Sequence, residues 1–324
     1  MSDIAAIRGA AERLKGRIRC TPLLSSPALA ALAGRRLLVK AECLQITGSF
    51  KARGAWSAIS ALAPDVRARG ILAYSSGNHA QGIAWAARGH GVPAVIVMPS
   101  DAPAAKIAGT RALGGETILY DRATESREEI GARLADERGL TLVRPFDDPQ
   151  VIAGQGTLGL EIAAQAAAAG VDGAADVIVP CGGGGLSAGV ALALKAEAPE
   201  LRLRTAEPEG FDDTARSLTT GTRQRNARMT GSICDAIVTP TPGELTFPIL
   251  KRLAGPGLVV SDAEALRAVA LAFRHLKVVI EPGGAVALAA ALFRPEAIAG
   301  DTVIVVASGG NIDAALFSEA ILAG

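Results

Sequence analysis

The sequence of 324 residues has few aromatic side chains and almost no net charge. Only 3% of its residues are Phe, Trp or Tyr, and 33 Lys and Arg nearly balance 32 Asp and Glu. A formal charge of +1 is far from the clustered positive charge with which dedicated nucleic-acid binders neutralise phosphates. We therefore expect no nucleic-acid partner.

The sequence also lacks cysteine pairs, a leader and long apolar runs. Its four cysteines form neither a CxxC pair nor the Cys/His spacing of a zinc site, which is typical of reduced thiols in the cytosol. The N-terminus carries Asp3 and Glu12 and has no apolar run of signal-peptide length. No stretch reaches the roughly 18 apolar residues of a membrane span. We expect a cytoplasmic protein that does not bind membranes.

Apolar residues and glycine are abundant instead. The apolar fraction is 49%, and there are 37 glycines. Together with the low net charge this excludes a disordered chain, and the length favours about two domains. The many small residues predict a core in which backbones approach closely.

Short runs rich in Val, Ile and Leu alternate with longer helical stretches. Several runs are continuously apolar, which is typical of strands buried on both faces of a parallel sheet. The alternation predicts an α/β fold with right-handed crossovers. The predicted strands span 36–42, 70–75, 93–98, 116–120, 141–145, 176–180, 202–207, 257–260 and 302–307. The predicted helices span 52–62, 122–137, 157–169, 185–197 and 262–275, the last after a Ser261–Glu264 capping-box pattern.

Lys51 follows a Gly-Ser-Phe turn at the start of the predicted helix 52–62. The positive end of the helix dipole disfavours an ammonium group there and so lowers the pKa of the lysine. An amine with a lowered pKa suits a nucleophile that forms a Schiff base. For this segment alone, an ordinary surface lysine is an equally good interpretation.

The segment Ser75-Ser76-Gly77-Asn78-His79 directly follows the predicted strand 70–75. Ser and Asn are helix-capping residue types, and the free amides of a helix start can hold a carboxylate or a phosphate. A capped helix without a ligand is the alternative. Two hydroxyls, an amide and an imidazole at the carboxyl end of a strand favour a binding site.

Four consecutive glycines, Gly182 to Gly185, lie between a predicted strand and a predicted helix. Their backbone amides can surround a phosphate without interference from side chains. Gly183 to Ala188 also fits the GxGxxA dinucleotide fingerprint, with Glu207 where a ribose-binding acid is expected. An NAD-dependent oxidoreductase is therefore an alternative, but it leaves Lys51 and the Ser/Asn segment without a role.

Ser308 follows the last predicted strand, in Ser308-Gly309-Gly310-Asn311. Its hydroxyl can make a neutral hydrogen bond to a ring atom of a ligand. A Schiff-base lysine, a phosphate cradle, a carboxylate site and a neutral ring partner are together what pyridoxal phosphate bound to an amino acid requires.

Six segments carry a resemblance to a known family. They are SFKARGA (49–55), SSGNHAQG (75–82), GQGTLGLEI (154–162), GGGGLSAG (182–189), IEPGGAVALAA (280–290) and SGGN (308–311). The chain resembles the fold-type II, tryptophan-synthase β-like pyridoxal-phosphate enzymes, and among them the serine/threonine dehydratases and serine racemases. The resemblance implies two domains, each an open, mostly parallel, twisted sheet flanked by helices. Residues 1–69 and 147–324 would bind the cofactor, and residues 70–146 the substrate carboxylate.

The resemblance also implies roles for individual residues. Lys51 would form the Schiff base and remove the Cα proton of the substrate, and Ser76 matches the second base of racemases. The implied cofactor contacts are Phe50, Asn78 at the phenolic oxygen, Gly182, Gly183, Gly184 and Gly185 at the phosphate, and Ser308 at the pyridine nitrogen. The implied contacts of the substrate carboxylate are Ser75, Gly77, Asn78 and His79. Glu207, Asp213 and the carbonyl of Phe211 match a site for Mg²⁺, Ca²⁺ or Mn²⁺.

The activity that the resemblance implies is β-elimination of water from threonine, serine or hydroxyaspartate, giving a keto acid and ammonia, in a homodimer. A neutral serine at the ring nitrogen favours this elimination over transamination. An amino-acid racemase is the nearest alternative, and a catalytically inactive binding protein is another. Asp235-Ala236 stands where the family commonly has Asp-Gly, so we expect the extra methyl to crowd the pocket and to favour hydroxyaspartate or another 3-hydroxy amino acid. Because the sequence stops after the catalytic core, we expect no C-terminal regulatory domain.

Overall fold

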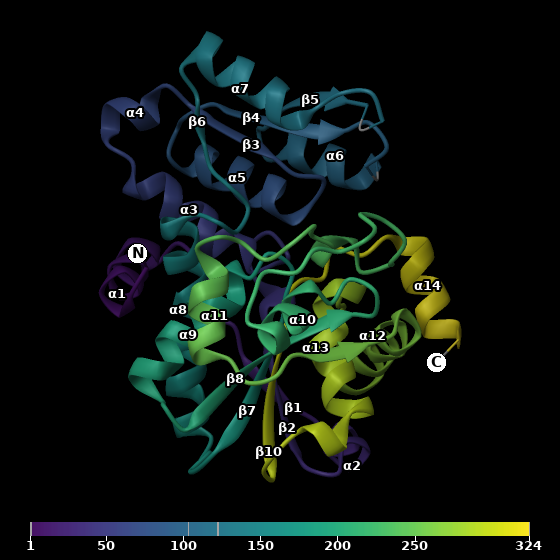
Figure 1. Ribbon diagram of the computed structural model, residues 1–324. Helices are drawn as coiled ribbons and strands as arrows, with labels where there is room; N and C mark the ends of the chain where they lie inside the picture. The colour runs from purple at the N-terminus through teal and green to yellow at the C-terminus, as the bar shows by residue number, and fades with distance from the viewer. Residues whose placement is uncertain (1, 103, 122, 324) are drawn as a thin grey trace.

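The computed structural model describes residues 2–102, 104–121 and 123–323, which form two β-sheets with helices on both faces (Figure 1). The larger sheet contains β1 (Leu23–Ser25), β2 (Arg36–Ala41), β7 (Ala175–Pro180), β8 (Leu201–Pro208), β9 (Leu258–Val260) and β10 (Thr302–Ala307). The smaller sheet contains β3 (Ile71–Tyr74), β4 (Ala94–Pro99), β5 (Glu116–Tyr120) and β6 (Thr141–Leu142). The strand orders are β1-β2-β10-β7-β8-β9 and β5-β4-β3-β6. Every pairing is parallel except that of β1 with β2, which confirms the predicted α/β fold.

Helices connect the strands. The helices in the part of the chain that forms the smaller sheet are α3 (Lys51–Ala61), α4 (Pro64–Ala68), α5 (Asn78–Gly89), α6 (Ala104–Ala112) and α7 (Arg127–Arg138). The others are α1 (Ile4–Leu14), α2 (Pro27–Ala33), α8 (Pro149–Ala168), α9 (Gly185–Glu197), α10 (Asp213–Thr220), α11 (Thr246–Leu253), α12 (Asp262–Leu276), α13 (Pro282–Phe293) and α14 (Ala314–Ala323). Three short 3₁₀ helices are η1 (Glu42–Leu44), η2 (Asp235–Ile237) and η3 (Pro295–Ala297). In the described part of the chain, no helix has the length and apolarity of a membrane span.

The larger sheet is buried on both faces. In β10, Val303 and Val305 pack in a core with residues of α12 and α13, whereas Ile304 and Val306 pack in a core with residues of α8 and α9. Successive side chains of a strand point to opposite faces, so a strand covered on both faces needs apolar residues throughout. This explains the continuous apolar runs of the sequence.

The predicted strands are confirmed near their bounds, with two differences. The short strand β1 was not predicted. The predicted strand 141–145 is too long, because β6 ends at Leu142 and the chain then turns toward the space between the sheets. The backbone of Pro145 thereby becomes available to the site described below.

Helix starts follow their capping residues. The predicted helix 122–137 begins too early, because Ser126 accepts the amide of Glu129 at 3.2 Å and α7 starts at Arg127; residue 122 lies outside the described residues. Helix α8 starts at Pro149 rather than at residue 157, because Asp148 caps it. The capping box of Ser261 and Glu264 at α12 is confirmed.

A buried charge cluster fixes the start of α3. Arg53 is fully buried and lies 2.8 Å from Glu42 of η1 and 2.7 Å from Glu161 of α8. A buried guanidinium needs such partners, since an unpaired buried charge is strongly destabilising. The cluster thus holds Lys51, two positions earlier, against the larger sheet.

All four strands of the smaller sheet lie between residues 71 and 142, and those of the larger sheet lie outside this range. The predicted domains, 1–69 with 147–324 and 70–146, and their division of labour between cofactor and substrate stay predictions.

Candidate active site

A cavity of about 250 Å³ opens where strands of both sheets end. Its wall contains all the residues that were predicted to contact the cofactor or substrate: Phe50, Lys51, Ser75, Ser76, Gly77, Asn78, His79, Gly182, Gly183, Gly184, Gly185 and Ser308. Parallel α/β sheets bind ligands at the carboxyl ends of their strands, and this cavity follows β3, β7 and β10. Glu207, Phe211 and Asp213 are not among the residues of this wall.

Lys51 begins α3 inside this cavity. Its Nζ donates to the carbonyl of Pro145 at 2.8 Å and lies 5.1 Å from the centre of the Phe50 ring. Burial lowers the pKa of Lys51 to about 8, and the nearby Glu281 partly opposes this effect. A lowered pKa was predicted from the helix dipole, and in the structure burial of the amine lowers it. The amine can thus lose its proton near neutral pH.

The glycine loop offers backbone amides to the cavity. Gly184 has φ of +90°, a left-handed conformation that favours glycine, and it precedes α9. A Cβ on Gly183 would clash with the ring of Phe146, and one on Gly185 would lie 2.9 Å from the backbone of the same phenylalanine. No acceptor within the described residues binds the amides of Gly182 to Gly185. These amides suit an anion such as a phosphate.

Helix α5 starts on the opposite side of the cavity. Gly77 is its N-cap and no side chain caps it, so the alternative of a capped helix without a ligand has no support here. Ser75 instead accepts the amide of Gly77 at 3.2 Å. Within the described chain the amides of Asn78 and His79 have no protein acceptor, so they can bind a carboxylate.

His79 is neutral in this environment. Its Nε2 lies 3.0 Å from the carbonyl of Val143, and burial lowers its pKa to about 3, with a smaller effect from Lys51. A neutral ring bonded to a carbonyl donates from Nε2. The side chain therefore fixes the start of α5 against the chain that follows β6.

Ser308 and Phe50 are held together by the backbone. The amide of Phe50 donates to the carbonyl of Ser308 at 3.1 Å, and Ser308 is almost fully buried. This bond brings the residue before the lysine beside the end of β10. Ser308 therefore lies in the wall of the same cavity as Lys51.

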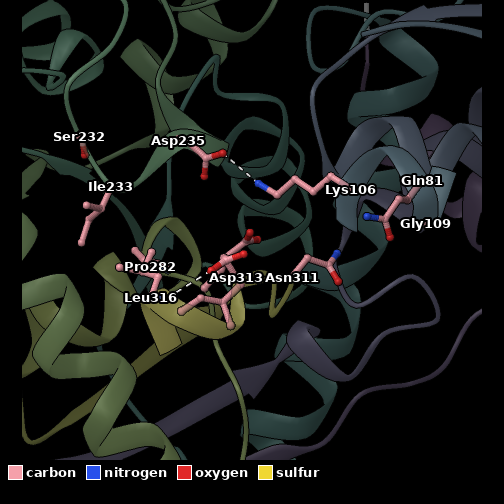
Figure 2. Close-up of a pocket in the computed structure, with 12 residues that line it drawn as sticks. Gln81, Lys106, Gly109, Ser232, Ile233, Asp235, Pro282, Asn311, Asp313 and Leu316 are labelled. Atoms are coloured by element: carbon pink, nitrogen blue, oxygen red, sulfur yellow. Dashed lines mark hydrogen bonds and ion pairs between the residues drawn. The ribbon is translucent and has the colours of Figure 1, made fainter. Parts of the chain in front are cut away.

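Four charged residues of the wall had no predicted role: Lys106, Arg127, Asp235 and Glu281. Lys106 of α6 reaches across to Asp235 of η2 at 2.9 Å (Figure 2). Glu281 is buried at the start of α13, and burial raises its pKa to about 7. Two sequence signals could have indicated Glu281: it lies in the segment IEPGGAVALAA (280–290) that carries the resemblance, and it is a charged residue before the apolar run 282–293. No local signal indicates the other three.

A second cavity has a volume of about 350 Å³. Figure 2 shows residues that line it. The two share Lys106, Asp235 and Glu281 in their walls. Ala236 lies on the wall of the first cavity and is exposed. Its expected effect on substrate choice stays a prediction.

Glu207 and Asp213 are buried behind the glycine loop. Glu207 accepts the amides of Thr214 and Ala215 at 3.0 and 2.7 Å, and so stabilises the start of α10. One oxygen of Asp213 accepts from Asn226 at 2.5 Å, and its other oxygen is buried without a partner. Burial raises the pKa of both carboxyls, and Asp213 raises that of Glu207 further. Among the described residues, no three His, Cys, Asp or Glu side chains gather as a metal cluster.

Comparison with known proteins agrees with this geometry. Residues 14–309 match the family model for pyridoxal-phosphate dependent enzymes. The chain is 43% identical over 305 residues to an L-threo-3-hydroxyaspartate ammonia-lyase of Pseudomonas sp. The aligned residues are 94% of this chain and 93% of the relative. It is 39% identical over 325 residues to a serine racemase of Oryza sativa subsp. indica, covering 99% and 94%.

A solved structure agrees as well. The threonine deaminase of T.th. is 46% identical and superposes with a TM-score of 0.90 over 96% of this chain and 99% of its own. The family is that of the resemblance seen in the six segments, and the NAD-dependent alternative has no support among these relatives. The chain belongs to the family of pyridoxal-phosphate dependent enzymes.

Proposed function

We propose that the protein is a pyridoxal-phosphate dependent ammonia-lyase that converts a 3-hydroxy amino acid to a 2-keto acid and ammonia. One observation supports this most directly. The buried amine of Lys51 shares a single cavity with two sets of unpartnered backbone amides, at Gly182–Gly185 and at Asn78–His79. The relatives named as hydroxyaspartate ammonia-lyase and threonine deaminase support the same reaction class.

The cofactor, when bound, supplies an electron sink for the Cα–H bond of the amino acid. Lys51 would hold the cofactor and then, as a free amine, remove the Cα proton. Burial favours the neutral form of this amine, which is the form that accepts a proton. Loss of the 3-hydroxyl as water and hydrolysis of the remaining C–N bond give the keto acid and ammonia.

The other wall residues would orient the two reactants. Gly182 to Gly185 would bind the phosphate, and Ser308 the pyridine nitrogen. The substrate carboxylate would bind to Ser75, Gly77, Asn78 and His79. The free side-chain N–H of Asn78 would bind the phenolic oxygen of the cofactor. Each role rests on the wall position of the residue and on the unpartnered amides. A hydroxyl rather than a carboxylate at the ring nitrogen keeps the ring neutral, which favours elimination.

We propose hydroxyaspartate as the preferred substrate. Its second carboxylate needs a cation, and Arg127 of α7 lies on the cavity wall with its guanidinium 5.4 Å from the centre of the Tyr74 ring. The other cations of the described wall have different partners: Lys51 donates to Pro145, and Lys106 pairs with Asp235. Arg127 bonds Glu128 at 2.8 Å, but that pair is half-exposed and exchanges readily with a ligand.

We further propose a divalent cation at Glu207 and Asp213, with the carbonyl of Phe211. Oxygen donors suit Mg²⁺, Ca²⁺ or Mn²⁺. The partnerless oxygen of Asp213 and its effect in raising the pKa of Glu207 support a bound positive charge. The cation would stabilise the loop behind the phosphate site and take no part in the reaction. A homodimer in the cytoplasm remains our expectation from the family.

A keto-acid assay over the isomers of serine, threonine and hydroxyaspartate, with chiral analysis of the remaining amino acid, tests the proposal. We expect keto acid from an L-3-hydroxy amino acid, fastest from hydroxyaspartate. Interconversion of D- and L-serine without keto acid would instead establish the racemase alternative, for which Ser76 lies on the cavity wall.

A further inference from the structure

The carbonyl groups of Gly182, Gly183 and Gly184, unlike their amides, have protein partners. The carbonyl of Gly183 accepts the hydroxyl of Thr246 at 2.6 Å and the amide of Gly243 at 3.1 Å. The carbonyl of Gly184 accepts the amide of Ala188 at 2.8 Å. The carbonyl of Gly182 is 3.5 Å from the hydroxyl of Thr214.

These partners determine where the amides point. In a planar trans peptide the C=O and the following N–H point in opposite directions. Fixing the carbonyl of Gly183 therefore fixes the amide of Gly184 on the other side of the same peptide plane. Glycine cannot fix this plane by itself, since its backbone is the most permissive of all residues.

Thr246 is well suited to this task. It is the first residue of α11, it is fully buried, and it is not among the residues of the cavity wall. A Cβ on Gly184 would lie 2.9 Å from its hydroxyl oxygen, so the hydroxyl packs directly against the loop.

Asp147 in turn positions Thr246. Its two carboxylate oxygens accept the amides of Glu244 and Leu245 at 3.0 and 2.9 Å, just before α11. Asp147 follows Phe146, whose ring lies against Gly183. The segment before α8 and the start of α11 thus hold the loop from two directions.

We propose that Thr246, held by Asp147, is a positioning residue that orients the Gly183–Gly184 peptide so that its amide binds the phosphate of the cofactor. This rests on the cofactor of the family and does not depend on which amino acid is the substrate. It predicts an effect on affinity for the phosphate and no effect on the Schiff base itself.

The test compares pyridoxal phosphate with pyridoxal, which lacks the phosphate. Dissociation constants are measured from the absorbance of the bound cofactor for wild type, Thr246→Val and Thr246→Ser. Val has nearly the shape of Thr without the hydroxyl, and Ser keeps the hydroxyl. We expect Thr246→Val to bind pyridoxal phosphate about tenfold more weakly and pyridoxal equally well, since a lost buried hydrogen bond has about this effect. We expect Thr246→Ser to remain within about twofold of wild type, because it keeps this hydrogen bond.

Thr110→Val is the matched control, because Thr110 is also a buried helix residue whose hydroxyl donates to a carbonyl, that of Lys106 at 2.9 Å. The ³¹P resonance of the bound cofactor is the second readout, and it should move in Thr246→Val and not in Thr110→Val. If Thr246→Val does not fold, Asp147→Asn replaces it in the comparison of pyridoxal phosphate with pyridoxal. This substitution weakens the bonds of Asp147 to the amides of Glu244 and Leu245, which position Thr246. Equal weakening of pyridoxal and pyridoxal phosphate, or no weakening of either, would overturn the proposal. Failure of the substrate assay would leave this result unaffected.

Discussion

The side chains of Asn78 and Glu281 meet at 2.5 Å, between Asn78 Nδ2 and Glu281 Oε1, although they are 203 positions apart in the chain. Asn78 begins α5 beside the smaller sheet, and Glu281 precedes α13 beside the larger one. Asn311 donates to the oxygen of the same amide at 2.7 Å. Two partners of opposite kind fix the orientation of the Asn78 amide and leave one N–H for a ligand. The contact also places a buried carboxyl in the site.

Replacing Glu281 with Gln is expected to change how stability depends on pH. Burial raises the pKa of this carboxyl from 4.5 to about 7, so the folded protein holds a proton that the unfolded chain has released. The stabilisation is complete below pH 4.5 and is lost as the pH rises through 7. Between these limits the free energy of unfolding of the wild type should fall by roughly 2–3 kcal/mol relative to Glu281→Gln.

Urea unfolding of the cofactor-free protein at several pH values measures this difference. Gln keeps an acceptor for Asn78, so the substitution removes mainly the titration. Glu200→Gln, at an exposed position, is the control and should parallel the wild type. A gap between wild type and Glu281→Gln that is constant with pH would contradict the shifted pKa.

Lys51→Ala should abolish elimination. The variant loses the only amine that the proposed mechanism uses, and we expect keto-acid formation to fall by at least about 10³-fold. Lys195→Ala, on an exposed part of α9, should keep full activity. Substantial turnover by Lys51→Ala in the keto-acid assay would show that another group removes the proton.

Arg127→Met should alter substrate choice. Loss of a charge-assisted bond to the second carboxylate should lower kcat/KM for hydroxyaspartate by about 10- to 100-fold, and that for serine by less than about threefold. Arg133→Met, on an exposed position of the same helix, should affect neither. Equal losses for both substrates would mean that Arg127 acts on the fold or the cofactor and not on the side chain of the substrate.

Mg²⁺ should stabilise the protein through Asp213. At saturating Mg²⁺ we expect the midpoint of thermal unfolding to rise by roughly 2–4 °C in the wild type, and EDTA to reverse the change. Asp213→Asn should show no such rise, whereas Glu209→Gln, exposed on the same loop, should resemble the wild type. If Mg²⁺ and EDTA leave the wild type unchanged, the proposed cation site is wrong.

Ser76→Ala separates elimination from racemisation. A base on the second face of the substrate is needed only for inversion at Cα. We expect the variant to lose D-serine formation while keto-acid formation changes by less than about threefold, well below the effect of losing an essential base. Chiral chromatography and the keto-acid assay measure the two activities. Parallel loss of both would assign Ser76 to substrate binding.

The local pattern of the sequence was enough for most strands and for many residues of the cavity wall. Strands such as β10 are apolar at every position because both faces are covered, and such a run can be recognised without any tertiary information. The cap at Ser261 is equally local, since its partner Glu264 is three positions away. The glycine loop and the Ser/Asn segment were recognisable because each directly follows an apolar run.

Other features depend on contacts between distant segments. The two residues of β6 pair with β3, and only that pairing defines where the strand ends. Lys106 and Asp235 meet across 129 positions. No pattern within either segment indicates such a partner, because exposed and paired charges have the same local sequence.

By itself, the sequence determined the α/β class, the order of most strands and helices along the chain, and the motifs that line the cavity, since these depend on periodicity and on neighbouring residues. Only the tertiary structure decided the environment of those motifs. It showed that burial lowers the pKa of Lys51, and that Glu281 and Asn311 fix Asn78. Burial and hydrogen bonding are sums over atoms that the fold brings together from distant positions, so no stretch of sequence contains them.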